Sequence, residues 1–399
     1  MRKIFLAKYA QSPFGNLRDY PIDAMLRDAG AHGLSDIDRG VIEHVAIAGV
    51  FTPLLNNQSL LAGLVAMDPA YAGKSIKSVA NACDSGSLAV TDCALTVLAG
   101  QAHAALAIGL EKMHPLEGKV DSKKIGEALG TAAHPTDLFP PLTFPHSFAI
   151  IMDRYLRAYG WSEDDMACIP PLFYENATHN PLAHIHKTKA PITKETVLGS
   201  LRLFSDPPLP LKLYECSQIS DGWARILVCD EEGLERLGVP RSAATELVGF
   251  GHAADSLSIA SRGENLLKPT GATRAFHAAM TMARVKTEDL SLQEVHDCFS
   301  VMAALAVEIT GLAEPGSGLR YFLDGRAARG SECPINTSGG LIAKGHPVSA
   351  TGIAMIGWVH QQLLGLVPPA LQVTNARVGS TLNIGGPICS TVATVQKPA

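Results

Sequence analysis

The sequence predicts an α/β protein built of two similar halves, with a subdomain inserted into the first. Short apolar runs alternate with helix-forming stretches, which is typical of a mainly parallel sheet covered by helices. The 399 residues exceed what one hydrophobic core usually supports. A proline-rich segment interrupts the alternation over about 113–213. We therefore expect an N-terminal half over 1–245, which includes the insertion, and a C-terminal half over 246–399.

In the first half, apolar runs predict strands and amphipathic or Ala-rich stretches predict helices. The expected strands lie at 2–8, 45–50, 75–80, 104–109 and 220–229, and the expected helices at 21–30, 59–67 and 88–99. The insertion carries two double-proline segments and one clear helix, over 147–159. We expect this insertion to cover an active site.

The second half repeats the scheme. Its expected strands lie at 246–251, 292–295, 370–373 and 388–395, and its expected helices at 272–284, about 300–310 and 351–364. Each half has one glycine-rich turn that leads into a long Ala-rich helix, near residues 83 and 348. Two similar halves would place these helices side by side, with their N-termini converging on one pocket.

Composition excludes several classes of protein. A net charge of −5 and a pI near 6.3 give no electrostatic case for nucleic-acid binding. No run of 18 apolar residues indicates a membrane span, and the N-terminus is too short in its apolar part for a signal peptide. The eight cysteines form no CxxC pair, which argues against a zinc ribbon and a disulfide scaffold. We expect a cytoplasmic protein whose thiols stay reduced.

Cys83 lies between an expected strand and the helix that starts near Ser85. Unpaired N–H groups and the positive end of the helix dipole favour a thiolate at such a position. Most cysteines in a cytoplasmic chain are buried and inert, so this stretch alone leaves both interpretations open.

His346 is the one imidazole in the run Asn336-Thr-Ser-Gly-Gly-Leu-Ile-Ala-Lys-Gly-His-Pro-Val-Ser-Ala-Thr-Gly352. Four glycines and Pro347 constrain the backbone around it, just before a helix. A neutral histidine beside a thiol can accept its proton, which activates the sulfur as a nucleophile. We favour this role over that of a structural core histidine.

Two further stretches carry weaker signals. His296 and Cys298 follow an expected strand, at the edge where open α/β sheets bind ligands. Ordinary buried residues at a strand end are an equally good interpretation. Gly385 belongs to a Gly-Gly turn whose N–H groups could contribute to an oxyanion hole, although such turns are common.

The insertion also contains charged and metal-binding residue types. His179, His184 and His186 could bind a metal, but a solvated loop is the better interpretation, and we expect no metal. Lys187, Lys189 and Lys194 could meet the phosphate groups of a ligand, although a solvated face is somewhat favoured.

Taken together, these stretches resemble the thiolase superfamily over nearly the whole chain. The Cys83 loop resembles the thiolase nucleophile loop, and Gly345-His346-Pro347 its histidine loop. His296-Asp-Cys-Phe299, in place of the Asn-Glu-Ala-Phe of other thiolases, resembles the sterol-carrier-protein-type and archaeal-like branch. Gly109-Leu-Glu-Lys-Met113 and Ile219-Ser-Asp-Gly222 match strand ends that flank the family's loop domain. No lipid-transfer domain is expected to follow.

The resemblance implies a fold of two βαβαβαββ halves in five α-β-α-β-α layers. It implies that Cys83 is acylated, that His346 activates it, and that Cys298 is the second acid/base, since Asn383 stands where other thiolases have a cysteine. His346 and His296 would form one oxyanion hole, and the N–H groups of Cys83 and Gly385 the other.

The family likeness implies acyl-CoA and coenzyme A as substrates, no tightly bound cofactor, and a homodimer or homotetramer. Ser349 stands where the family usually has glycine, and Pro387 follows a glycine turn that in the family usually continues with small residues. Two other functions stay open: a decarboxylating ketoacyl-synthase-type condensing enzyme, which also uses a Cys-His-His set, and a catalytically silent acyl-CoA-binding subunit.

Overall fold

The computed structural model describes residues 2–138, 143–188 and 190–399. Lys189 and most of the first double-proline segment, which spans 139–145, lie outside these residues. Over the described residues the chain forms one nine-stranded sheet, in the order β3-β2-β4-β5-β1-β6-β9-β8-β7. Its strands are β1 (Phe5–Gln11), β2 (His44–Ala48), β3 (Ser75–Val79), β4 (Ala104–Glu111), β5 (Gly222–Cys229), β6 (Ala244–Ala254), β7 (Leu292–Val295), β8 (Gly379–Gly385) and β9 (Ser390–Pro398).

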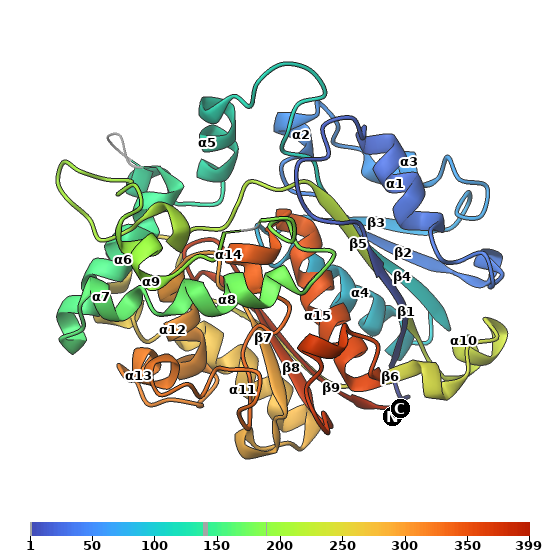
Figure 1. Ribbon diagram of the computed structural model, residues 1–399. Helices are drawn as coiled ribbons and strands as arrows, with labels where there is room; N and C mark the ends of the chain where they lie inside the picture. Colours follow the sequence, from blue (N-terminus) through green and yellow to red (C-terminus); the bar gives the residue numbers. More distant parts are fainter. Residues whose placement is uncertain (1, 139–142, 189) are drawn as a thin grey trace.

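Two helices from different halves form the centre of the molecule, α4 (Ser85–Leu98) and α15 (Val348–Leu364). They pack against each other, with β2, β4 and β5 on one side and β7, β8 and β9 on the other (Figure 1). The outer faces are covered by α1 (Ile22–Ala31) and α3 (Leu61–Val65) at one end and by α11 (Thr270–Ala283) and α12 (Ser300–Ile309) at the other. The result is the expected α-β-α-β-α layering.

The remaining helices are mostly short and lie in the connections. They are α2 (Thr52–Leu55), α5 (Ser122–Gly130), α6 (Phe144–Tyr159), α7 (Glu163–Met166), α8 (Ile169–Thr178), α9 (Lys194–Leu198), α10 (Glu231–Arg236), α13 (Gly318–Leu323) and α14 (Gly340–Lys344). Helices α5 to α9 belong to the insertion and gather at the side of the sheet where α14 and the N-terminus of α15 lie (Figure 1). The ends of the insertion are tied by a buried ion pair, Lys112 Nζ to Asp221 Oδ2 at 2.9 Å.

Alternating burial explains the layers. In β1, Phe5 and Ala7 pack beneath α1, whereas Leu6 packs on the opposite face with α4 and α15. This alternation, repeated in neighbouring strands, gives the sheet an apolar surface on both faces and buries it between helices.

Two expectations about the sheet are wrong. We expected mainly parallel pairing, but only the β2–β3, β2–β4 and β7–β8 pairs are parallel, and the pairs β4–β5, β1–β5, β1–β6, β6–β9 and β8–β9 are antiparallel. The strand expected at 370–373 is instead a short 3-10 turn, Pro369–Leu371, and the missed strand is β8. The division of the chain at residue 245 stays a prediction.

Glycine allows the two central helices to approach closely. A Cβ on Gly86 of α4 would lie 2.5 Å from the backbone oxygen of Ser349 on α15, and a Cβ on Gly352 would overlap the backbone of Ser87. Side chains at these positions would push the helices apart. The small residues that open each helix therefore bring the residues just before them together.

Candidate active site

Cys83 lies in the turn between β3 and α4. Ala82 has a positive φ of 51°, a conformation that non-glycine residues seldom adopt. The Ser85 hydroxyl holds this turn, because Oγ accepts from the Asn81 N–H at 2.7 Å and donates to the Ala82 carbonyl at 2.6 Å. The turn presents Cys83 at the start of α4 while leaving only 4% of the residue exposed.

His346 stands two residues before α15, and its neighbours fix its tautomer. Its Nδ1 lies 2.7 Å from Thr351 Oγ1, and the Thr351 hydroxyl donates its single proton to the Pro347 carbonyl at 3.0 Å. Thr351 can therefore only accept from the ring, so Nδ1 carries the proton. The Nε2 atom of His346 is left as a proton acceptor.

His296 follows β7 and takes the opposite tautomer. Its Nδ1 lies 3.0 Å from Asn383 Nδ2, and Asn383 Oδ1 accepts from the Ser87 hydroxyl at 2.9 Å. This arrangement turns the amide nitrogen toward His296, and a nitrogen that donates requires an unprotonated Nδ1. The proton of His296 is therefore on Nε2, which can act as a hydrogen-bond donor.

The structure brings Cys83, His296 and His346 together. One side-chain N or S atom from each residue lies within 4.8 Å of the others, and the two imidazole rings meet edge to face at 5.3 Å. This confirms the expectation that the starts of two helices, one from each half, aim at one site. The trio is also spaced to hold a metal ion, but an Nε2 that carries a proton has no lone pair for a metal.

Burial determines the protonation of this trio. Burial, followed by the charge of the neighbouring Asp84 carboxylate, raises the pKa of Cys83 to about 12. Burial, followed by the nearby Lys344 ammonium, lowers the pKa of His346 to about 3. The resting pair is thus a thiol and a neutral imidazole. The thiolate that the helix position favours does not form here, because loss of hydration outweighs the dipole.

The turn that follows β8 packs against the nucleophile loop, and the oxyanion-hole role expected of Gly385 stays a prediction. Gly385 and Gly386 line one cavity with Asn81 and Ala82, the residues just before Cys83. Gly385 is the last residue of β8, opposite Ser390. It packs against the nucleophile loop so closely that a Cβ there would lie 2.5 Å from Asp84 Oδ1.

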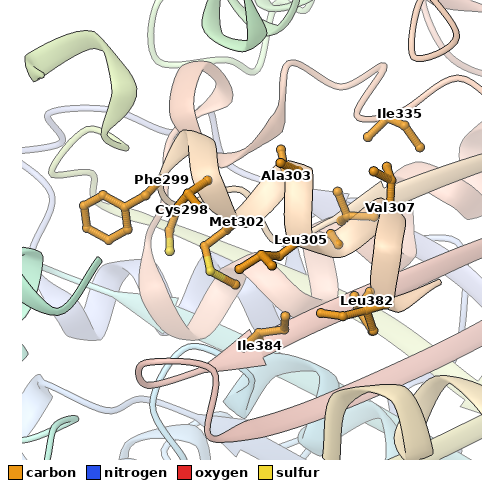
Figure 2. Packing of buried hydrophobic residues seen from close by; sticks show 14 of the residues in the cluster. Cys298, Phe299, Met302, Ala303, Leu305, Val307, Ile335, Leu382 and Ile384 are labelled. Atoms are coloured by element: carbon orange, nitrogen blue, oxygen red, sulfur yellow. The ribbon is translucent and has the colours of Figure 1, made fainter. Parts of the chain in front are cut away.

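Cys298 lies at the start of α12 and is also buried. Figure 2 shows it beside Phe299 and Met302, on the side of α12 that faces Ile384 of β8. Burial raises the pKa of Cys298 well above its ordinary value, and the charge of a Cys83 thiolate raises it further. Cys298 is therefore a protonated thiol at neutral pH, and its acid/base role stays a prediction.

Sequence reasoning missed three positioning residues. Asn383 was noted only as a departure from other thiolases, and Thr351 was not singled out. The third is Asp297, whose carboxylate accepts from the N–H groups of Leu341 at 2.6 Å and Ile342 at 3.4 Å. Asp297 so ties the His296 strand end to α14, the helix that precedes His346. Hydrogen-bonding side chains next to catalytic candidates are the signal that would have found all three.

Two of the weaker candidates of the insertion, His184 and Lys194, have other partners. His184 Nδ1 lies 3.0 Å from Ser220 Oγ, the same hydroxyl that accepts from the His346 N–H at 3.2 Å. Lys194 pairs with Asp164 at 2.6 Å near the surface.

Across the part of the chain that the structure describes, no helix has the length and apolar character needed to cross a bilayer.

Comparisons with known proteins agree with this geometry. The family model described as "Thiolase, N-terminal domain" matches residues 4–202, and that described as "Thiolase C-terminal domain-like" matches residues 251–397. An acetyl-CoA acetyltransferase of Methanothermobacter thermautotrophicus is 30% identical, over 97% of each chain. Sterol carrier protein 2 of Oryctolagus cuniculus is 27% identical, over 95% of this chain and 68% of its own.

Solved structures show the same fold. An acetyl-CoA acetyltransferase from Syntrophomonas wolfei superimposes with a TM-score of 0.76 at 18% identity, with both chains fully covered. The paired family models, the archaeal relative and the converging cysteine and histidines lead to one conclusion. The chain belongs to the thiolase family.

Proposed function

We propose that this thiolase is an acetyl-CoA acetyltransferase that works through an acyl-Cys83 intermediate. The observation that carries the proposal is the pair of opposite tautomers. His346 offers a proton acceptor and His296 a proton donor at one sulfur. A nucleophile needs the first, and a carbonyl oxygen that gains negative charge needs the second.

In the thiolytic direction, Cys83 attacks the 3-keto carbon of a 3-ketoacyl-CoA while His346 takes the thiol proton. The bond between the second and third carbons then breaks, and Cys298 protonates the second carbon, which releases acetyl-CoA. Coenzyme A attacks the acyl-Cys83 thioester and carries the acyl group away. The reverse sequence is a Claisen condensation.

Two oxyanion holes follow from the same geometry. His296 Nε2–H, joined by His346 once it has accepted a proton, would bind one oxygen. The N–H groups of Cys83 and Gly385 would bind the other, since Gly385 packs against the nucleophile loop. One such donor is typically worth about 10²–10³ in rate.

The surroundings of the sulfur support a short acyl group. Cys83 shares a closed apolar cluster with Phe51, Met113, Ile125 and Val348. Ile125 comes from α5, so the insertion closes the acyl side of the site as a cover. Apolar side chains packed around Cys83 favour a small apolar acyl group, such as acetyl, over long or polar ones.

The roles of the two catalytic cysteines separate in one experiment. Cys83→Ala abolishes all turnover, whereas Cys298→Ala transfers an acetyl group from acetyl-CoA to Cys83 but fails to cleave acetoacetyl-CoA. Intact-protein mass spectrometry detects the acyl-enzyme, and absorbance detects cleavage. Cys168→Ala, at a partly exposed thiol of the insertion, is the matched control.

The rival functions give different results. Full thiolysis by Cys298→Ala would reject the assigned role of Cys298. Release of carbon dioxide from a malonyl thioester, without need of Cys298, would show a decarboxylating synthase. Unimpaired acyl-CoA binding with no acylation of Cys83 would show a silent binding subunit.

We also propose that the protein is a homodimer or homotetramer. Strand β3 ends the sheet and its residues are mostly exposed, and α3 packs beside it. Leu60 and Met67, which flank α3, are 68% and 74% exposed. Open strand edges beside apolar side chains are typical of interfaces. Light scattering on the purified chain tests this, and a monomer at micromolar concentration would contradict it. The cytoplasmic location stays a prediction.

A further inference from the structure

The turn between β8 and β9 holds an unusual backbone conformation. Ile388 has a φ of 58°, in the left-handed region that branched side chains almost never occupy. Its N–H closes a three-residue turn onto the Gly386 carbonyl at 2.8 Å, and the Cys389 N–H bonds the Gly385 carbonyl at 3.1 Å. Such a conformation persists only where surrounding groups enforce it.

Arg262 is the side chain that enforces it. Its Nη1 donates to the Ile388 carbonyl at 2.8 Å, and its Nη2 donates to the Pro387 carbonyl. The residue is only 7% exposed, so the guanidinium has given up nearly all its water to hold two consecutive carbonyls. A planar fork can bridge two acceptors in this way, whereas a lysine ammonium is a single point charge.

A residue of the insertion fixes the segment that carries Arg262. It lies in the segment Ala260–Leu266, and the residues just before this segment are fixed by Asp137. The Asp137 carboxylate accepts from the Ile259 N–H at 2.7 Å and from the Ser258 hydroxyl at 3.0 Å. The insertion thus reaches the β8–β9 turn through Arg262.

The turn matters because it begins at Gly385, which packs against the nucleophile loop: a Cβ on Gly385 would lie 2.5 Å from Asp84 Oδ1. Gly385 lies two residues before the first carbonyl that accepts from Arg262 and three before the strained Ile388. A shift of the turn would move the Gly385 N–H, the proposed oxyanion-hole donor, away from the oxygen of an acyl group on Cys83.

We propose that Arg262 is a positioning residue that holds the turn after β8 so that the Gly385 N–H points into the oxyanion hole of acyl-Cys83. This inference rests on the proposed function, since it needs the acyl-enzyme. In the step concerned, the Cys83 sulfur bonds to the acyl carbon and the bond from that carbon to the CoA sulfur breaks. The thiol proton passes through His346 to the departing CoA sulfur.

The test compares Arg262→Lys and Arg262→Met with the wild type and with Arg236→Lys, an exposed arginine of α10. Each protein is acetylated with acetyl-CoA carrying ¹³C at the carbonyl. We expect acylation by both Arg262 variants to slow by about 10- to 100-fold, below the 10²–10³ for complete loss of one donor. The KM for acetyl-CoA should change by less than about threefold, because the turn binds the reacting oxygen and not the CoA body.

Infrared spectroscopy measures the carbonyl stretch of the acyl-enzyme, which would not change if Arg262 had only a structural role. A weaker hydrogen bond to the thioester oxygen shifts its ¹³C=O stretch to higher wavenumber in the acylated fraction. If Arg262 only stabilises the fold, the melting temperature falls but the stretch stays at the wild-type position, and the proposal is wrong. If the wild type forms no acyl-enzyme, the proposed function and this inference fall together.

A second variant keeps the test decisive if the Arg262 variants are unstable. Ile388→Gly removes the side chain that makes the turn unfavourable, so the turn needs less support. Arg262→Lys should reduce the acylation rate in both backgrounds. We expect the fold-reduction to be at least threefold smaller in the Ile388→Gly background than in the wild-type background. Equal losses in both backgrounds would overturn the link between Arg262 and the turn.

Discussion

Replacing Thr351 by valine tests whether a hydroxyl sets the tautomer of His346. Valine has nearly the same shape but cannot accept from Nδ1–H, which now lies 2.7 Å from Thr351 Oγ1. Leaving a buried N–H unpaired costs about 1–3 kcal/mol. The imidazole avoids this cost by moving its proton to Nε2, where it can no longer accept from the Cys83 thiol. Since each 1.36 kcal/mol is a factor of ten in rate, acylation should fall about 10- to 100-fold.

Rapid quenching followed by intact-protein mass spectrometry measures the rate of acetyl transfer to Cys83 in a single turnover. Thr351→Ser is the matched control, because it keeps the hydroxyl and its donation to the Pro347 carbonyl, and its rate should stay within about threefold of the wild type. Equal rates for Thr351→Val and Thr351→Ser would show that the hydroxyl does not set the tautomer, and the assignment of His346 as base would lose its structural support.

Three more changes give distinct results. Asn383→Asp replaces a donor to His296 by an acceptor, reverses the tautomer, and should slow acylation about 100-fold; single-turnover kinetics check this, and a change below threefold contradicts it. Ile125→Ala opens the acyl side of the cluster around Cys83. The ratio of the rate of hexanoyl transfer to the rate of acetyl transfer should therefore rise by at least about tenfold over the wild type. An unchanged ratio would show that the acyl pocket lies elsewhere. Burial raises the pKa of Glu111 to about 7, so its carboxyl stabilises the fold below about pH 4.5 and loses this contribution as pH rises to 7. Chemical denaturation should therefore show that the free energy of unfolding of Glu111→Gln, relative to that of the wild type, rises by about 3 kcal/mol between pH 4.5 and 8. A difference between the two proteins that does not change with pH would refute the raised pKa of Glu111.

The sequence was informative where chemistry and local pattern coincide. Cys83 and His346 each precede an Ala-rich helix, and small residues beside them allow the helices to touch, so their convergence could be predicted. The order and direction of the strands could not be predicted, because apolar runs such as β4 and β5 have the same sequence pattern in parallel and in antiparallel pairs. Strand β8 was missed because Ser380, Thr381 and Asn383 interrupt its apolar pattern, although all three are buried.

The state of the nucleophile lay beyond local sequence for another reason. The position of Cys83 before α4 predicts a lowered pKa, but the pKa depends on how much water the packed chain leaves at the sulfur. Burial comes from Phe51, Met113 and Val348, which are far from Cys83 in the sequence. Tautomers depend likewise on contacts between separate segments, as between Asn383 and His296.

The two histidines are oriented by neutral groups, and this explains how one site can serve two opposite needs. A carboxylate behind either ring would stabilise its charged form and draw a proton from the thiol at rest. A hydroxyl behind His346 and an amide behind His296 fix the positions of the protons without adding charge. The thiol then stays protonated until a thioester carbonyl is near enough for the new carbon–sulfur bond to offset the cost of charge separation. A buried, low-polarity site with Cys83 and Cys298 both protonated is thus unreactive without substrate, and the same desolvation strengthens each oxyanion-hole bond once substrate is bound.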